Sequence, residues 1–478
     1  MVFNTLPFLL FLPAAFALYW LLRRAHYRWQ NLMLVGLSLV FYGWWDWRFL
    51  PLLVGVALVD YLVGRGLAAA EKPGRRKLLL GLSLAANLGA LGFFKYCNFF
   101  IDSFASLLRL VGLQPHIGSL EIILPLGLAF FTLRSMTYTI DVYKGRMKAT
   151  RDPIAYLAFV SFFPHLLAGP IERARYFLPQ LEQRREFDPD HAADGLRQML
   201  WGFVKKVVVA DMAAQAVNAV FLSYHLQDTP TLIAGLFLFA VQLYGDFSGY
   251  SDIAVGTARL FGFKSVRNFA YPYFSRNVAE FWRRWHISLM SWFREYVFYP
   301  LGGPMKGKGR WILNTLVVFA VSGLWHGSDW TFVAWGLLNG LYFIPLILRK
   351  NPPITKGTVA KDRLFPSLKE ALQMLGTFLL IMLSWVFFRA ETMAQAWGYL
   401  KAMVTNFGFG GLGYGYLKWP VIASLALLLV EWFQRKRRHT LRITKLPRWL
   451  RWIIYYALIA ILIFFGTYGS TEFIYMQF

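Results

Sequence analysis

Apolar runs of about 20 residues recur from one end of this sequence to the other, and they leave few options for the fold. A helix of that length crosses the ~30 Å hydrocarbon core of a bilayer. Lipid offers the backbone no hydrogen-bond partner, so only helices and closed barrels span it, and the alternation typical of barrel strands does not appear. The chain is 57% hydrophobic and only 16% charged. The sequence therefore predicts an all-α polytopic membrane protein.

The apolar runs also place the expected helices. We expect about 11–12 transmembrane helices, near residues 1–22, 31–45, 50–68, 78–94, 121–140, 195–222, 230–248, 309–327, 330–348, 368–388, 418–433 and 450–470. The segment 100–114 is ambiguous. If it spanned, the basic stretch 141–151 would lie outside, against the positive-inside rule. We therefore expect 100–114 to lie at the outer surface and 121–140 to span.

The excess of basic residues sets the expected orientation. The chain carries 50 Lys and Arg against 25 Asp and Glu, which in a soluble protein would favour a nucleic-acid partner. In a membrane protein, basic residues gather on cytoplasmic loops, and the clusters at 23–28, 71–77 and 434–448 fit that rule. The first helix has no basic residue before it, so we expect it to stay uncleaved with its N-terminus outside. Both termini are expected outside, and the partner is the lipid bilayer, with no nucleic acid.

The chain has a single cysteine, Cys97. One cysteine excludes an internal disulfide and any cysteine-rich metal site, and we expect no metal centre. No internal repeat is evident, which argues against a transporter built from inverted halves. No linker separates independent domains either, so we expect residues 1–478 to form one domain that ends in a short tail, 471–478.

Two of the polar stretches that interrupt the apolar pattern precede residue 260. In FVSFFPHLLAGPIERARYF (159–177), Pro164 and Pro170 break any helix, so we expect a re-entrant or interfacial element in which His165 is structural. In QLYGDFSGYSDIAVG (242–256), Asp246 and Asp252 follow an apolar helix. Charged groups at membrane depth usually face a partner or a water-filled cavity. A polar loop at the cytoplasmic interface is the alternative.

The stretch YFSRNVAEFWRRWHISLMSWFREYVFYPLGG (273–303) is rich in tryptophan and arginine. Composition favours a helix lying in the headgroup plane on the cytoplasmic side. Arginine also pairs with phosphates through two hydrogen bonds, so Arg283 and Arg284 could meet an anionic cytosolic substrate.

In VSGLWHGSDWTFVAWGLLNG (321–340), His326 stands between two tryptophans inside an apolar stretch. Composition favours an interfacial histidine capped by aromatic-belt tryptophans. The alternative is a neutral imidazole acting as a general base, since the ordinary pKa of ~6.5 suits that role near neutral pH.

Four motifs in this order resemble the membrane-bound O-acyltransferase family: PHLLAGPIER, YGDFSGYSDIAVG, FWRRWHISLMSWFREYVFYPLGG and GLWHGSDWTFVAWGLLNG. They are similar in particular to its bacterial alginate O-acetyltransferase branch, as are the N-terminal MVFNTLPFLLFLP and the C-terminal TEFIYMQF. The resemblance implies a helical bundle with re-entrant and interfacial helices around a central tunnel, with its core motifs near 159–340. It also implies a multi-pass protein of the bacterial inner membrane with periplasmic termini.

The resemblance implies acyl transfer from a cytoplasmic thioester to a hydroxyl group. The family's essential histidine corresponds to His326, and a second, more variable position corresponds to His286. This replaces the interfacial interpretation of His326. The expected donor substrate is acetyl-CoA, with no bound cofactor. That Arg283 or Arg284 meets the donor phosphates is our own inference from the residues.

The tail TEFIYMQF resembles a C-terminal tyrosine motif that is thought to take the acyl group in related systems. It implies acetylation of Tyr475 and onward transfer by a periplasmic SGNH-type acetyltransferase to an exported polysaccharide such as alginate. Met476 stands where an aromatic residue is usual. From the residues alone, the tail could instead be an interfacial anchor.

Other functions remain open at this stage. The acceptor could be peptidoglycan or another exopolysaccharide, and the donor could be a D-alanyl carrier protein. A transporter of an acyl donor, or a scaffold that only recruits the periplasmic enzyme, would need neither His326 nor Tyr475 for chemistry.

Overall fold

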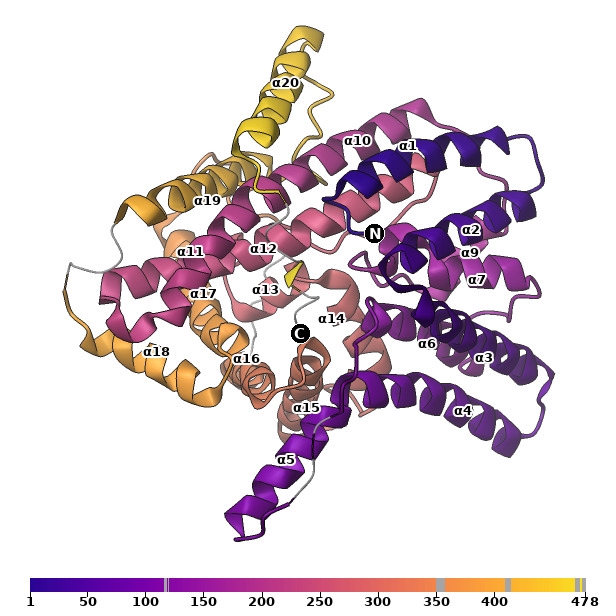
Figure 1. The fold of residues 1–478 in the computed structure, drawn as a ribbon, viewed down its shortest axis with the longest axis horizontal. Coiled ribbons are helices and arrows are strands. Elements are labelled where there is room, and N and C mark those ends of the chain that lie inside the picture. Colours follow the sequence, from indigo (N-terminus) through magenta and orange to yellow (C-terminus); the bar gives the residue numbers. More distant parts are fainter. Residues whose placement is uncertain (116–117, 119, 350–356, 409–413, 469–472, 475–478) are drawn as a thin grey trace. The chain divides into compact units, whose positions relative to one another are not determined.

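The computed structural model describes residues 1–115, 118, 120–349, 357–408, 414–468 and 473–474. Within these ranges the regular structure is helical, without a β-strand (Figure 1). The α-helices are α1 (Leu6–Leu21), α2 (Tyr27–Asp46), α3 (Leu50–Ala69), α4 (Pro73–Leu91), α5 (Cys97–Leu110), α6 (Leu128–Tyr143), α7 (Pro153–Ser161), α8 (Phe163–Leu166), α9 (Ala174–Leu181), α10 (Pro189–Phe203), α11 (Asp211–Leu222), α12 (Thr229–Leu260), α13 (Val278–Arg284), α14 (Ile287–Phe293), α15 (Lys308–His326), α16 (Trp330–Leu348), α17 (Leu368–Arg389), α18 (Met393–Thr405), α19 (Tyr414–Gln434) and α20 (Arg448–Phe465).

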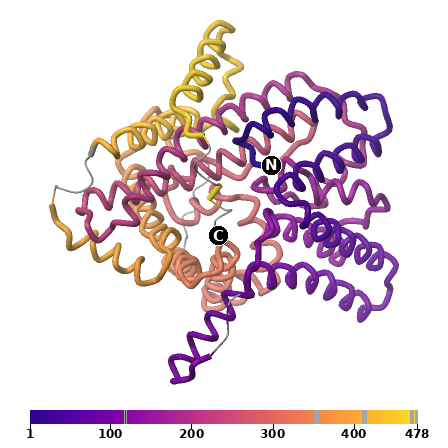
Figure 2. The backbone as a smooth tube through the Cα atoms, in the orientation of Figure 1, coloured from indigo at the N-terminus to yellow at the C-terminus, as the bar shows by residue number. Residues whose placement is uncertain are grey.

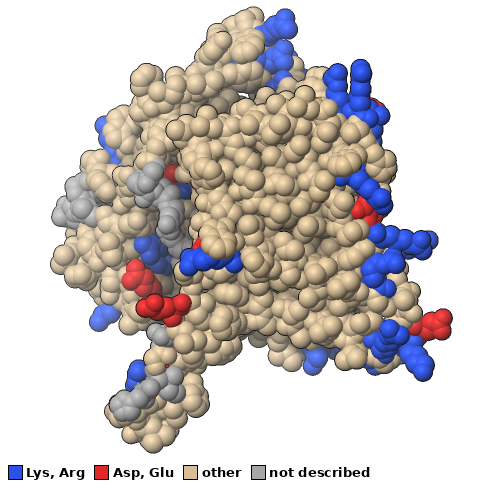
Figure 3. Space-filling view, turned by 45° about the vertical axis from the view of Figure 1, so that its right-hand side comes forward, with Lys and Arg blue, Asp and Glu red and all other residues tan. Residues whose placement is uncertain are grey.

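Seven helical segments of the described chain are long and apolar enough to cross a membrane. They are 27–69, 73–110, 229–260, 330–348, 368–389, 415–434 and 448–465. The first contains both α2 and α3, each as long as one crossing requires. Figure 3 shows wide surface areas without charged side chains. On α20 no residue is buried, and many of its apolar side chains are exposed, while Ile454, Leu458 and Leu462 pack against the core. These features confirm an all-α, multi-pass membrane protein.

The chain divides into two compact units, of which the first contains residues 1–195 and 257–266. In this unit, α3 packs against α4, α6 and α7. One buried carboxylate of this unit is well paired: Ser135 donates to Asp60 at 2.6 Å, and Asn87 donates to the same oxygen at 2.8 Å. Such pairing is required where no water reaches a polar group.

The prediction that proline breaks the helix around residues 159–177 is confirmed. The segment folds as the short helices α7, α8 and α9, separated by coil. Arg134 of α6 is fully buried and donates to the backbone carbonyls of Phe159, Val160 and His165. It therefore satisfies carbonyl groups that a broken helix leaves open. His165 itself is buried, with Nε2 3.1 Å from the Ser265 hydroxyl.

The segment 100–114 is helical as far as Leu110, as part of α5, which continues from α4. A π-helical turn, Gly92–Tyr96, joins α4 to α5, and the tube of Figure 2 follows this run as it leaves the other helices of the first unit. Phe100, Phe104 and Leu107 are more than half exposed along α5. An exposed apolar face of this kind fits a lipid environment.

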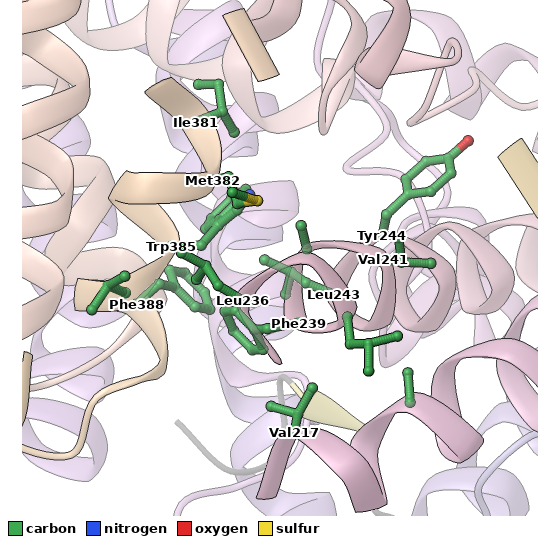
Figure 4. Packing of buried hydrophobic residues seen from close by; sticks show 14 of the residues in the cluster. Val217, Leu236, Phe239, Val241, Leu243, Tyr244, Ile381, Met382, Trp385 and Phe388 are labelled. Atoms are coloured by element: carbon green, nitrogen blue, oxygen red, sulfur yellow. The ribbon is translucent and has the colours of Figure 1, made fainter. Parts of the chain in front are cut away.

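The second unit, residues 196–256 and 267–478, holds the histidines of interest. Its core lies between α12 and α17. Figure 4 shows Met382, Trp385 and Phe388 of α17 beside Leu236 and Phe239 of α12.

Two expectations about this second unit are wrong: the end of a helix near 248 and the headgroup helix at 273–303. The stretch 242–256 is also not the polar loop that was the alternative interpretation. It is the continuation of α12, which runs to Leu260 with Asp246 buried. The stretch 273–303 is not a single helix at the headgroups, because α13 and α14 are separate and their tryptophans Trp282, Trp285 and Trp292 are buried. Composition cannot separate a buried aromatic helix from an interfacial one, since both are rich in tryptophan. Helix α18 was not expected from the sequence.

Candidate active site

His326 is the last residue of α15, at the turn into α16. The two helices pack closely because glycine lies at their contacts: a Cβ at Gly323 would meet the carbonyl oxygen of Phe332, and one at Gly336 would meet that of Phe319. Asp329 caps α16 by accepting a hydrogen bond from the Thr331 amide at 2.8 Å. The small residues and the cap of the motif 321–340 thus fix the turn that carries His326.

Aromatic rings surround the His326 side chain, which is 3% exposed. The ring centroid lies 5.0 Å from that of Trp335 on α16, 5.5 Å from Phe388 on α17 and 5.0 Å from its neighbour Trp325. Trp335 and Phe388 were not identified from the sequence. They follow His326 by 9 and 62 positions and come together with it only when α15, α16 and α17 pack.

His286 lies at the break between α13 and α14, in a conformation unusual for a residue with a side chain. Its φ of 40° places it in the left-handed region, which costs about 1–3 kcal/mol for a non-glycine residue. Asn268 holds the backbone at this break. Its carbonyl oxygen accepts a hydrogen bond from the Ile287 amide at 2.8 Å, and its side-chain oxygen accepts one from the Ser288 amide. Strain held in place by such contacts is a feature of functional sites.

The structure brings the two predicted histidines together. Their ring centroids are 6.5 Å apart, and His286 also contacts Trp325 and Phe247. Burial lowers the pKa of His286, which lies outside the candidate spanning helices, to about 3. The ring is therefore neutral near pH 7, with one nitrogen able to donate and the other to accept a hydrogen bond. Two imidazoles at this separation can act on one small reacting group between them.

The two predicted arginines have different environments. Arg284 pairs with Glu280 at 2.7 Å and donates to the carbonyl oxygen of Ala270, so it holds the α13 region together. Burial alone would raise the pKa of Glu280, but hydrogen bonds and charge from Arg276 and Arg284 outweigh burial and lower it. Arg283 is exposed instead.

Arg283 lines a cavity of about 540 Å³ between α13, α14, α15 and α16. Arg294 lines it as well, and the remaining lining is mainly apolar. Trp282 forms part of the wall, with its ring 5.8 Å from that of Trp335, which in turn touches His326. The cavity thus has cationic side chains in its lining, and the rings of Trp282 and Trp335 connect it to His326.

Ion pairs join the α12 carboxylates to the π-helical turn Val204–Ala210. Asp252 pairs with Lys205, and Asp246 pairs with Lys206 at 2.8 Å. Lys206 also pairs with Asp211 at 2.7 Å. The two lysines were not identified from the sequence, although charged residues inside the apolar run WGFVKKVVVA are a signal for a buried partner.

The C-terminal tail enters this second unit. Phe473 and Ile474 are 1% and 3% exposed, so these residues do not form an interfacial anchor. The Phe473 ring stacks on Tyr250 of α12 at 4.2 Å and lies 6.0 Å from Phe247, the ring that touches His286. The short yellow segment in the middle of Figure 2 is this part of the tail. The predicted acceptor, Tyr475, is the next residue and lies outside the described residues.

Comparison with known proteins identifies the family of this chain. A family model for the membrane-bound O-acyltransferase family matches residues 126–349. The chain is 40% identical to a Pseudomonas putida protein named Probable alginate O-acetylase AlgI, over 86% of this chain and 81% of that one. It is 35% identical to the Peptidoglycan O-acetyltransferase of Helicobacter pylori, over 87% and 82% of the two chains.

A more distant relative transfers a different group. The Teichoic acid D-alanyltransferase of Bacillus subtilis is 31% identical over 48% of this chain and 60% of its own length. The names of these relatives share acyl transfer and differ in acyl group and acceptor. The chain belongs to the membrane-bound O-acyltransferase family and is a multi-pass membrane acyltransferase.

Proposed function

We propose that this protein transfers acetyl groups from cytoplasmic acetyl-CoA, by way of Tyr475, to a periplasmic SGNH-type acetyltransferase that modifies an exported polysaccharide such as alginate. The protein would lie in the bacterial inner membrane with both termini in the periplasm. The names of the most similar relatives support acetyl transfer to a polysaccharide. The observation that carries the proposal is the position of His326, buried beside His286, in the same unit as both the cavity and the tail.

The chemical step needs a base because a phenol has an ordinary pKa near 10. His326 takes the proton from the acceptor hydroxyl as the oxygen attacks the thioester carbonyl carbon. The carbon–sulfur bond then breaks, the acetyl group is left as an ester on the acceptor, and the departing thiolate takes up the proton. His326 ends α15, and the partial negative charge of a helix C-terminus favours the imidazolium formed during the step.

The cavity beside α13 is suited to the donor. Arg283 and Arg294 could pair with phosphate groups of CoA, and the apolar wall could accept the thioester arm. Trp282 and Trp335 lie between this cavity and His326. Arg284 contributes by holding α13 through Glu280.

Purified protein incubated with acetyl-labelled CoA in the absence of a glycan tests the proposal. We expect free CoA and protein-bound label in equal amounts, at most one per chain, with both lost in His326→Ala. A D-alanyl carrier protein should give no label. Label that comes from the carrier protein but not from acetyl-CoA would show that the carrier protein, and not acetyl-CoA, is the donor. Release of CoA by the His326→Ala variant would contradict the role of this histidine.

A further inference from the structure

The tail is held by its backbone as well as by its side chains. The amide of Ile474 donates a 2.7 Å hydrogen bond to Oδ2 of Asp246 in the middle of α12. Both residues are buried, and a hydrogen bond to an ionised carboxylate is stronger than a neutral one. A backbone bond of this kind fixes the position of the chain whatever side chain stands at 474.

Asp246 is itself held in place. Its Oδ1 is 2.8 Å from the Lys206 ammonium, whose second carboxylate partner is Asp211 at 2.7 Å. The single ammonium group of Lys206 is shared by the two carboxylates of Asp246 and Asp211. The Ile474 amide therefore supplies one more hydrogen-bond donor to this buried pair of carboxylates. The lysine faces α12 because Gly202 and Gly249 allow close packing there: a Cβ on Gly249 would lie 2.7 Å from the Gly202 carbonyl oxygen.

The side chain of Phe473 fixes the register. It stacks on Tyr250, one turn beyond Asp246 on α12, and its edge contact with Phe247 brings it next to the ring that touches His286. Residue 473 is thus held by its ring and residue 474 by its backbone amide.

We propose that Asp246, oriented by Lys206, is a positioning residue for the acyl acceptor: it docks the tail backbone at Ile474 so that Tyr475 is presented to the histidine site. The inference rests on the proposed function, in which Tyr475 takes the acetyl group. In this proposal Asp246 acts on the tail backbone and takes no part in the bond-making step. It fixes the register of the tail, and this role accounts for a buried carboxylate that acid–base chemistry at His326 does not use.

The first test removes the tail's hydrogen-bond donor without altering the buried charges. Ile474→Pro has no amide hydrogen, whereas Ile474→Val keeps it and serves as the matched control. Amide hydrogen exchange of the C-terminal peptide measures docking, and mass spectrometry measures the initial rate of Tyr475 acetylation from acetyl-CoA. We expect Ile474→Pro to speed exchange at the flanking amides and to lower acetylation about tenfold, the size of effect of a charged hydrogen bond. The KM for acetyl-CoA should stay within about twofold of wild type, because neither Phe473 nor Ile474 lines the cavity proposed for the donor.

The second test removes the acceptor. Asp246→Ala should reproduce both effects of Ile474→Pro. Asp252→Ala is its matched control, since Asp252 also lies on α12 and pairs with a lysine of the same turn but does not contact the described tail. Thermal unfolding in detergent shows whether either variant is destabilised. If Asp246→Ala and Asp252→Ala are destabilised equally but only Asp246→Ala exchanges its tail amides faster, the effect of Asp246 on the tail is distinct from a general effect on the fold.

The outcomes are distinguishable. Unchanged exchange in both Ile474→Pro and Asp246→Ala overturns the docking contact, and faster exchange with unchanged acetylation overturns the positioning role. A wild-type tail that is protected by Asp246 but never acetylated shows that the proposed relay through Tyr475 fails. In that case the positioning role falls with it, while the docking contact itself stands.

Discussion

At the scale of single residues, the site depends on where two imidazoles are placed. His326 ends a helix inside an aromatic enclosure, and His286 sits at a strained break 6.5 Å away. His165 belongs to the first unit, where its Nε2 lies 3.1 Å from the Ser265 hydroxyl and its carbonyl accepts from Arg134.

We predict that His326→Ala lowers acetyl transfer by about 10²–10⁴-fold, the usual contribution of a general base. The initial rate of label transfer from acetyl-CoA measures this loss. His165→Ala is the matched control: it should lower the temperature of unfolding through the lost packing while its folded fraction transfers acetyl normally. Equal losses of transfer in the two folded variants would contradict the assignment.

His286→Asn tests the second histidine without adding strain, because asparagine tolerates a positive φ. We predict that the variant unfolds at or above the wild-type temperature and transfers acetyl about tenfold more slowly, as expected when an orienting polar contact is lost. Thermal unfolding checks the predicted stability, and the initial rate of acetyl transfer checks the predicted loss of activity. If the folded His286→Asn protein transferred acetyl groups at the wild-type rate, this histidine would have only a structural role.

At the scale of helices, close packing of α15 against α16 places His326. Gly323 and Gly336 stand where the backbone of the other helix is nearest. We predict that Gly336→Val pushes the helices apart, costs about 1–3 kcal/mol through overpacking and lowers transfer with the loss of stability. Gly376→Val on α17, where a Cβ meets nothing within 4 Å, is the control for valine in a membrane helix. If both substitutions left stability and transfer unchanged, close packing of α15 against α16 would not be needed to place His326.

Helix positions followed from sequence far better than the contacts between helices. Each expected apolar run has a helix near it, because a 20-residue apolar segment in lipid has no other stable form. The end of α12 was misplaced because Asp246 and Asp252 look like loop residues until Lys205 and Lys206 are brought against them. The histidine pair came from resemblance of motifs. The aromatic enclosure and the buried tail depend on long-range packing, which periodicity does not encode.

At the scale of the whole molecule, the basic clusters predict one orientation in the bilayer. After Cys97→Ser, single cysteines at Arg75 and Lys436 should react with an impermeant thiol reagent only from the cytoplasmic side. A cysteine at Leu226, exposed between α11 and α12, should react from outside. Labelling of intact and permeabilised cells checks this. Reaction of Lys436→Cys in intact cells would reverse the assignment and, with it, the side from which the donor enters.

The proposed function requires that His326, acting as a general base, promotes transfer of the acetyl group from acetyl-CoA to Tyr475, and this transfer can be measured directly. The C-terminal peptide is weighed after the purified protein has met acetyl-CoA, with His326→Ala and Tyr475→Phe run alongside. We predict a gain of ~42 Da on Tyr475 in the wild-type peptide and no gain in either variant. An acetylated peptide in His326→Ala, or an unmodified wild-type peptide while CoA is still released, would contradict it.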